Sequence, residues 1–196
     1  MRTVRCLTLM VALAISAPVV VPTSDLAAQS RQEMSDGAWP EADPADVESI
    51  DAIIAALYDV ISGPIGEKRD WDRFRSLFVP DARLIPTGQG QGDGPVYQML
   101  TPDEYETTAA AFLEERGFFE TETARTLEMF GHVAHAFSTY DSRWKEDDPE
   151  PFDRGINSIQ LMHDGERWAI MNIFWAAESA GLTIPERYKT SRRPDR

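Results

Sequence analysis

The sequence predicts an α+β fold in which helices come first and a mainly antiparallel sheet follows. Three observations lead to this prediction. Apolar residues recur at helical spacing between Val47 and Ile61. Long strand-like segments follow one another from Phe118 onwards. The dipeptide Asp164-Gly165 divides the apolar segment 155–178 in the way that a type I′ turn divides a β-hairpin.

The first two helices are defined by an apolar stripe and by the residues that end each stripe. The first is expected to begin near residues 44–46 and to end before Gly63, which a proline follows. The second is short: Asp70 is a suitable N-cap, aromatic and leucine side chains form one stripe over residues 71–78, and Pro80 ends it.

The third helix carries the clearest start signal of the chain. Thr101 is a suitable N-cap, a proline takes the first helical position, and two acidic residues follow near the positive end of the helix dipole. The helix is expected to end at Gly117. Before it, residues 81–85 read as a short strand and the glycine-rich residues 86–95 as a mobile loop.

The remaining chain reads as strands. Expected strands cover residues 118–130, 132–144, 152–163 and 166–178. In the last strand both faces are apolar, with Ile173 and Trp175 on one and Trp168 and Phe174 on the other. Both faces should therefore be covered, one by the helices and one by a second copy of the chain in a homodimer.

Both ends of the chain look different from its middle. Residues 1–28 have the basic start, apolar core and small residues of an export signal, so a periplasmic or secreted protein is expected. An uncleaved anchor is the alternative. Residues 29–45 are expected to be a disordered tether, residues 46–180 the folded domain, and residues 181–196 a flexible tail.

Composition restricts the chemistry of the mature protein. Its only cysteine, Cys6, lies in the signal, so no disulfide, thiol nucleophile or thiolate metal site is expected. Loss of Arg2, Arg5 and Asp25 with the signal takes the net charge from −14 to about −15, which repels phosphate backbones and argues against nucleic acid. We expect no membrane partner after signal removal, and the histidines and acids lack metal-ligand spacing. No cofactor is expected.

Two segments carry a resemblance to a known superfamily. They are residues 71–78, reading WDRFRSLF and running into Asp81-Ala82, and the hairpin residues 164–170, reading DGERWAI. With the order of helices and strands, they resemble the nuclear transport factor 2-like superfamily, which includes ketosteroid isomerases, scytalone dehydratases and SnoaL-like cyclases. The resemblance implies a cone-shaped fold, with about three helices packed on a curved sheet that encloses a pocket. It does not fix a function, because this fold hosts enzymes, carriers and dimerisation modules.

Two residues are candidates for catalysis. Tyr58 lies where the isomerases keep a phenol as hydrogen-bond donor, and the alternative, which we favour, is a core tyrosine. The position of their catalytic aspartate falls at Pro86 or Thr87, and neither residue abstracts protons. His132 and His135 are three apart in a strand and point to opposite faces, so only one of them, His135, is expected in the pocket.

Ligand-binding candidates lie in the strands of the hairpin. Alternation puts Arg154, Ser158 and Gln160 on one face of the first strand and Asn157 on the other. Arg154 could pair with a carboxylate or enolate, and Trp175 is a further candidate. A polar outer face of the sheet is the alternative explanation.

Together these features predict an exported domain that binds a small apolar or carbonyl-bearing molecule, with no activity assigned. Two alternatives remain open. The first is a cofactor-free lyase or isomerase acting on a small carbonyl compound. The second is a structural dimerisation module whose cavity is closed.

Overall fold

The structure of the chain is a computed structural model, which describes residues 39–89, 94–179 and 181–192. All of them belong to one compact unit, Ala38–Arg196. The expected export signal, the first part of the expected tether and the centre of the glycine-rich loop lie outside the described residues. Within the described part, no helix is long and apolar enough to cross a membrane.

The helices begin at the expected capping residues, with one difference. They are α2 (Pro44–Val47), α3 (Ile50–Ile61), α4 (Trp71–Ser76), α5 (Pro102–Arg116) and the 3₁₀ helix η1 (Glu186–Tyr188). The predicted first helix is two helices, because Ser49 is extended and its side chain caps α3 by accepting from the Ala52 amide. At the start of α5, Thr101 and Glu104 form a reciprocal capping box.

Six strands form one curved, mixed sheet. They are β1 (Phe78–Gln89), β2 (Pro95–Tyr97), β3 (Phe119–Phe130), β4 (Val133–Arg143), β5 (Asp153–His163) and β6 (Trp168–Ala177), in the order β2-β1-β6-β5-β4-β3. Among the strand pairs of the described residues, only β1–β6 is parallel. β1 is longer than the predicted strand 81–85, because its end, predicted as loop, pairs with β2. The α+β fold class expected from the sequence is confirmed.

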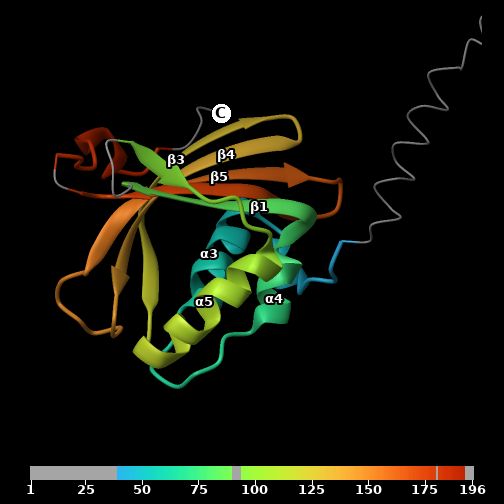
Figure 1. Cartoon of the computed structure of the whole chain (residues 1–196). Coiled ribbons are helices and arrows are strands. Elements are labelled where there is room, and N and C mark those ends of the chain that lie inside the picture. The colour runs from blue at the N-terminus through green and yellow to red at the C-terminus, as the bar shows by residue number, and fades with distance from the viewer. Residues whose placement is uncertain (1–38, 90–93, 180, 193–196) are drawn as a thin grey trace, which may run out of the picture. The chain divides into compact units, whose positions relative to one another are not determined.

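The helices cover one side of the sheet, as Figure 1 shows for α3, α4 and α5. The core lies between them and the sheet. Its large, fully buried apolar side chains come from α3, α4, β1, β5 and β6 and from the C-cap of α4: Ile53, Ile54, Phe74, Leu77, Phe78, Ile159, Leu161 and Ile170. Burial of so many large apolar side chains on this side fixes the register of the strands, since a one-residue slip would expose them.

The hairpin of β5 and β6 is present, but its turn is not the predicted type I′ turn. That turn needs positive φ at both central residues, and in the described residues only glycines have positive φ. Instead, the Asp164 carboxylate accepts hydrogen bonds from the amides of Glu166 and Arg167, both at 2.8 Å. Gly165, at φ 116°, closes a four-residue loop between the strands.

A bulge changes the faces that the sequence predicted for β6. Gln160 pairs with Asn172 and Leu161 with Ile170, so Met171 is an extra residue in β6. Ile170 and Ile173 therefore point to the same helix side, although alternation had put them on opposite faces. Beyond the bulge, Trp175 also points toward the helices, where its ring contacts Tyr105.

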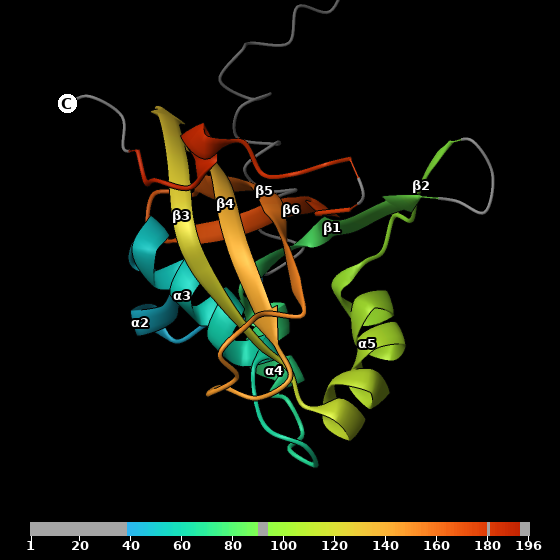
Figure 2. The ribbon, with the colours of Figure 1, turned by 90° about the vertical axis from the view of Figure 1, so that its left-hand side faces the viewer.

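Both expected disordered ends contribute packed residues. Trp39 packs against the core, and the Arg167 guanidinium lies 5.1 Å from its ring. The C-terminal segment, residues 181–192, lies across the sheet on the side away from the helices (Figure 2). There the Arg192 amide donates to the Arg125 carbonyl and its carbonyl accepts from Leu127. Main-chain hydrogen bonds to β3 thus replace the predicted loose tail over these residues.

Candidate functional site

A pocket of about 280 Å³ lies between the helices and the sheet; we call it the helix-side pocket. α5 and the strands β3 to β6 supply most of its walls. Its lining residues are Leu57, Ile61, Phe74, Leu84, Tyr105, Phe112, Phe118, Glu120, Tyr140, Ser142, Phe152, Asp153, Asn157, Ile173 and Trp175. Seven aromatic side chains and two carboxyl groups in one concave site are the composition of a small-molecule site rather than of a packed core.

Glu120 is the central polar group of this pocket. Its carboxyl accepts hydrogen bonds from the Ser142 hydroxyl at 2.9 Å and from the Asn157 amide at 3.4 Å. Burial raises the pKa of Glu120 to about 7, although these two bonds act in the opposite direction and Asp153 adds a smaller upward contribution. Near neutral pH the group is therefore present both as an acid and as a base.

Two phenols and a second carboxyl group surround Glu120. Burial raises the pKa values of Tyr105 and Tyr140, so both phenols keep their protons at neutral pH. Neither hydroxyl has a hydrogen-bond partner within the described part of the chain, so both can donate to a bound molecule. Burial also raises the pKa of Asp153, against a hydrogen bond from the Arg154 amide.

Tyr140 fits under β5 because residue 155 is a glycine. A Cβ atom at Gly155 would lie 2.4 Å from the Tyr140 hydroxyl oxygen and 2.4 Å from the Ala176 carbonyl oxygen. Any larger residue would therefore push the phenol out of its place in the pocket wall. This explains the Gly155 that precedes the polar residues of β5.

Tyr58, a catalytic candidate from the sequence, lies beside the pocket rather than in its wall. Its hydroxyl lies 2.7 Å from the Ser138 hydroxyl and accepts from the Asn157 amide at 3.1 Å. Because Ser138 donates its own proton to Glu122, Tyr58 donates to Ser138. The Tyr58 hydroxyl thus donates one hydrogen bond and accepts another within the protein. Burial raises the pKa of this phenol.

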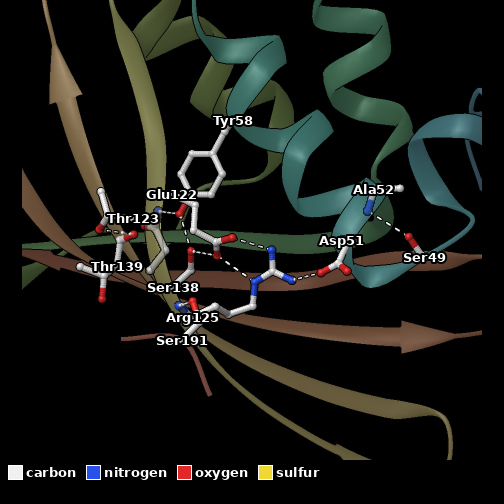
Figure 3. Close-up of polar contacts among 11 residues, drawn as sticks. Ser49, Asp51, Ala52, Tyr58, Glu122, Thr123, Arg125, Ser138, Thr139 and Ser191 are labelled. Atoms are coloured by element: carbon white, nitrogen blue, oxygen red, sulfur yellow. Dashed lines mark hydrogen bonds and ion pairs between the residues drawn. The ribbon is translucent and has the colours of Figure 1, made fainter. Parts of the chain in front are cut away.

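Figure 3 shows how the hydrogen bonds of Tyr58 and Ser138 continue into ion pairs of Glu122 with Arg125 and of Arg125 with Asp51. A bulge after Glu122 brings Glu122 and Arg125, three residues apart in β3, to the same side of the strand. Arg125 donates two hydrogen bonds to the Glu122 carboxylate and a third to Asp51 of α3 at 2.7 Å. The network fixes α3 on the sheet and so determines one side of the pocket.

The other sequence candidates divide between the two faces as alternation predicted. Asn157 faces the helices, whereas Arg154, Ser158 and Gln160 lie on the opposite face of β5. Arg154 donates to the Asp141 carboxylate at 3.0 Å, and its side chain is 46% exposed. His135 lies on that outer face too, 2.9 Å from the Ser158 hydroxyl, so it is not in the helix-side pocket.

Reasoning from sequence missed Glu120, Tyr105 and Tyr140. Glu120 and Glu122 alternate with threonine in an expected strand, a pattern that usually marks a solvated face. The available signal was Phe118-Phe119 directly before them, because phenylalanine side chains are among those most often buried. Among the described residues, no group of three or more His, Cys, Asp and Glu side chains is placed to hold a metal ion.

Comparisons with known proteins give only distant likenesses. No family model and no curated protein matches the chain. A protein of unknown function with a cystatin-like fold from Nostoc punctiforme is 14% identical, at a TM-score of 0.49, over 66% of this chain and 88% of that one. An NTF-2-like protein of unknown function from Silicibacter pomeroyi is 15% identical, at 0.44, over 67% and 94%.

A putative scytalone dehydratase from Novosphingobium aromaticivorans is 12% identical, at a TM-score of 0.46, over 76% of this chain and 94% of that one. The last two names fall within the superfamily that the sequence resembles. At such identities and TM-scores the likenesses carry no argument about function. The class of protein is therefore defined by the fold itself, helices on a curved mixed sheet around a pocket.

Proposed function

We propose that this protein is an exported small-molecule-binding domain whose helix-side pocket takes a small apolar molecule bearing a carbonyl group. The observation that carries the proposal is Glu120, a carboxyl group with a pKa of about 7 inside an aromatic pocket of about 280 Å³. Such a group donates or accepts a hydrogen bond according to the ligand. Tyr105 and Tyr140 supply two more donors, which suit a carbonyl oxygen.

The same groups support a second proposal, cofactor-free proton transfer of the lyase or isomerase type. Ionised Glu120 takes a proton from the carbon beside the carbonyl group, and the C–H electron pair moves to the oxygen as an enolate forms. The two phenols stabilise that oxygen by donating hydrogen bonds. Glu120 then returns the proton to another carbon, or to a departing hydroxyl group. A base with a pKa near the working pH is the group that this step needs.

Exchange of carbon-bound protons for deuterium in D₂O tests the catalytic proposal. With 2-tetralone as probe, we expect deuterium uptake beside the carbonyl group above the buffer rate, measured by mass spectrometry. Glu120→Gln should bring the rate to background, whereas Glu166→Gln, at an exposed residue of the β5–β6 loop, should not. Equal rates for the native protein and Glu120→Gln would refute a role for Glu120 as base.

Ligand binding is tested separately from catalysis. Titration calorimetry with acetophenone should give binding that Ile173→Phe, which fills the helix-side pocket, weakens by at least tenfold. Ile156→Phe adds the same ring on the opposite face of the sheet and serves as the matched control. Binding unaffected by Ile173→Phe would contradict the proposed site, and no binding of any small molecule would favour the structural module.

Export and dimerisation are proposed from the sequence and from exposed apolar residues. The intact mass of protein from the host's extracytoplasmic fraction should lack residues 1–28; the full mass would contradict cleavage. For the homodimer, the β3–β4 hairpin exposes Met129, Phe130 and Val133, with Phe130 87% exposed. Native mass spectrometry should give a dimer that Phe130→Glu dissociates and Ile65→Glu, at a residue 65% exposed elsewhere, leaves intact.

A further inference from the structure

A second cavity, of about 400 Å³, lies on the face of the sheet away from the helices; we call it the outer cavity. Its floor is formed by outer-face side chains of three neighbouring strands, including Phe137, Ile156 and Phe174. Its other wall is the C-terminal segment, through Leu182 and Tyr188 among others. Since Phe174 and Leu182 are 49% and 52% exposed, the cavity presents apolar surface to the solvent, which a ligand would cover.

The cavity wall is held on the sheet by groups that do not depend on a ligand. The Ile184 amide donates to the Glu178 carboxylate at 2.6 Å, and the Thr139 hydroxyl donates to the Tyr188 carbonyl at 2.6 Å. Beyond these contacts, Arg192 makes main-chain hydrogen bonds to β3. The C-terminal segment is thus fixed at several points, and the space beneath it is a preformed cavity rather than a gap under a free end.

Charged side chains of both signs line this cavity, but they form no ion pair with each other in the described residues. Arg187 lines it, and its guanidinium lies 4.7 Å from the ring of Tyr188. No carboxylate forms an ion pair with Arg187 in the described ranges, whereas Lys189, two residues on, pairs with Glu186 at 2.6 Å. The one carboxylate of the lining, Glu178, is engaged by the Ile184 amide. An anionic group of a ligand would therefore find Arg187 available.

From this geometry we propose that the outer cavity is a second binding site, specific for an aromatic or aliphatic carboxylate. The apolar part of the ligand lies against Phe137, Ile156 and Phe174, beneath the C-terminal segment. Its carboxylate pairs with the Arg187 guanidinium, which matches a planar carboxylate in a bidentate manner. The site is separate from the helix-side pocket and does not depend on Glu120.

The test uses 1-naphthoate and its neutral analogue 1-acetylnaphthalene in titration calorimetry on the full mature chain. Ile156→Phe should weaken binding of 1-naphthoate by at least tenfold, while Ile173→Phe, in the helix-side pocket, should leave it unchanged. Arg187→Gln should weaken 1-naphthoate about tenfold, about 1.4 kcal/mol, without changing the binding of 1-acetylnaphthalene. Lys189→Gln removes a neighbouring cation outside the cavity and should have no effect.

Three outcomes would overturn the proposal. If Ile173→Phe rather than Ile156→Phe abolishes binding, the carboxylate occupies the helix-side pocket. If Arg187→Gln weakens the binding of both probes equally, or of neither, Arg187 does not bind the carboxylate. If Ile156→Phe changes the dimer–monomer equilibrium and leaves 1-naphthoate bound as before, a second copy of the chain covers this surface.

Discussion

Replacing Glu120 by Gln removes an ionisable group from the helix-side pocket and keeps a side chain of nearly the same size. The carboxyl group has a pKa of about 7 in the folded protein, raised by burial from an ordinary value of 4.5. Below pH 4.5 it is protonated in both the folded and the unfolded chain. As the pH rises from 4.5 to about 7, the unfolded chain ionises before the folded one, so the folded state loses stability, and above 7 the loss is complete.

The size of this loss follows from the two pKa values. The rise from 4.5 to about 7 corresponds to about 3 kcal/mol at ~1.4 kcal/mol for each tenfold change in acidity. The Glu120→Gln variant does not lose this stability as the pH rises, because its side chain at position 120 never becomes charged. Its free energy of unfolding relative to the native protein should therefore increase by about 3 kcal/mol between pH 4 and pH 8.

Urea unfolding followed by tryptophan fluorescence measures this difference at each pH. Glu166→Gln, which removes an exposed carboxylate at the β5–β6 loop, is the matched control and should show no such trend. A difference between Glu120→Gln and the native protein that stays constant with pH would refute the reasoning. It would mean that the Glu120 carboxyl is solvated and titrates as in the unfolded chain.

Three further substitutions test the packing around the pocket by the same unfolding assay. Gly155→Ala should destabilise the protein by about 2 kcal/mol, because its Cβ would overlap Tyr140; an unchanged midpoint would show that the phenol moves freely. Arg69→Met should destabilise the protein by about 3 kcal/mol, since the buried guanidinium donates to four backbone carbonyls of the α3 and α5 regions. If Arg69→Lys were as stable as the native protein, the several donors of a planar guanidinium would not be needed here. Tyr58→Phe should cost about 1–2 kcal/mol by leaving Ser138 without its donor, and a neutral result would mean that water replaces the hydroxyl.

The sequence predicted the fold well where local chemistry decides the structure. Helix α5 begins and ends as expected, because Thr101 caps it and Gly117 takes a positive φ of 70° that few other residues adopt. The division of β5 into an Asn157 face and a Ser158 face was also predictable. Strict alternation holds there because no bulge interrupts β5 between its pairs with β4.

Prediction failed where a pattern depends on distant partners. The residues around Met171 do not indicate a bulge, because the bulge arises from the pairing of β6 with β5. Beyond it, each residue of β6 lies on the face of the sheet opposite to the one that simple alternation predicts. Asp164-Gly165 favours a type I′ turn locally, but the Asp164 side chain instead binds two amides of its own loop. Glu120 was overlooked because its partners, Ser142 and Asn157, lie 22 and 37 residues away in the chain.

The pairing of β1 with β6 has a consequence for how this protein is made. β1 is the first strand of this sheet in sequence, yet its long partner β6 is the last, and Pro86 pairs with Trp175. During synthesis, β1 must therefore wait for nearly the whole domain before the sheet closes. Such non-local pairing slows folding, so the nascent chain stays unfolded for longer than one whose strands pair with their neighbours in sequence.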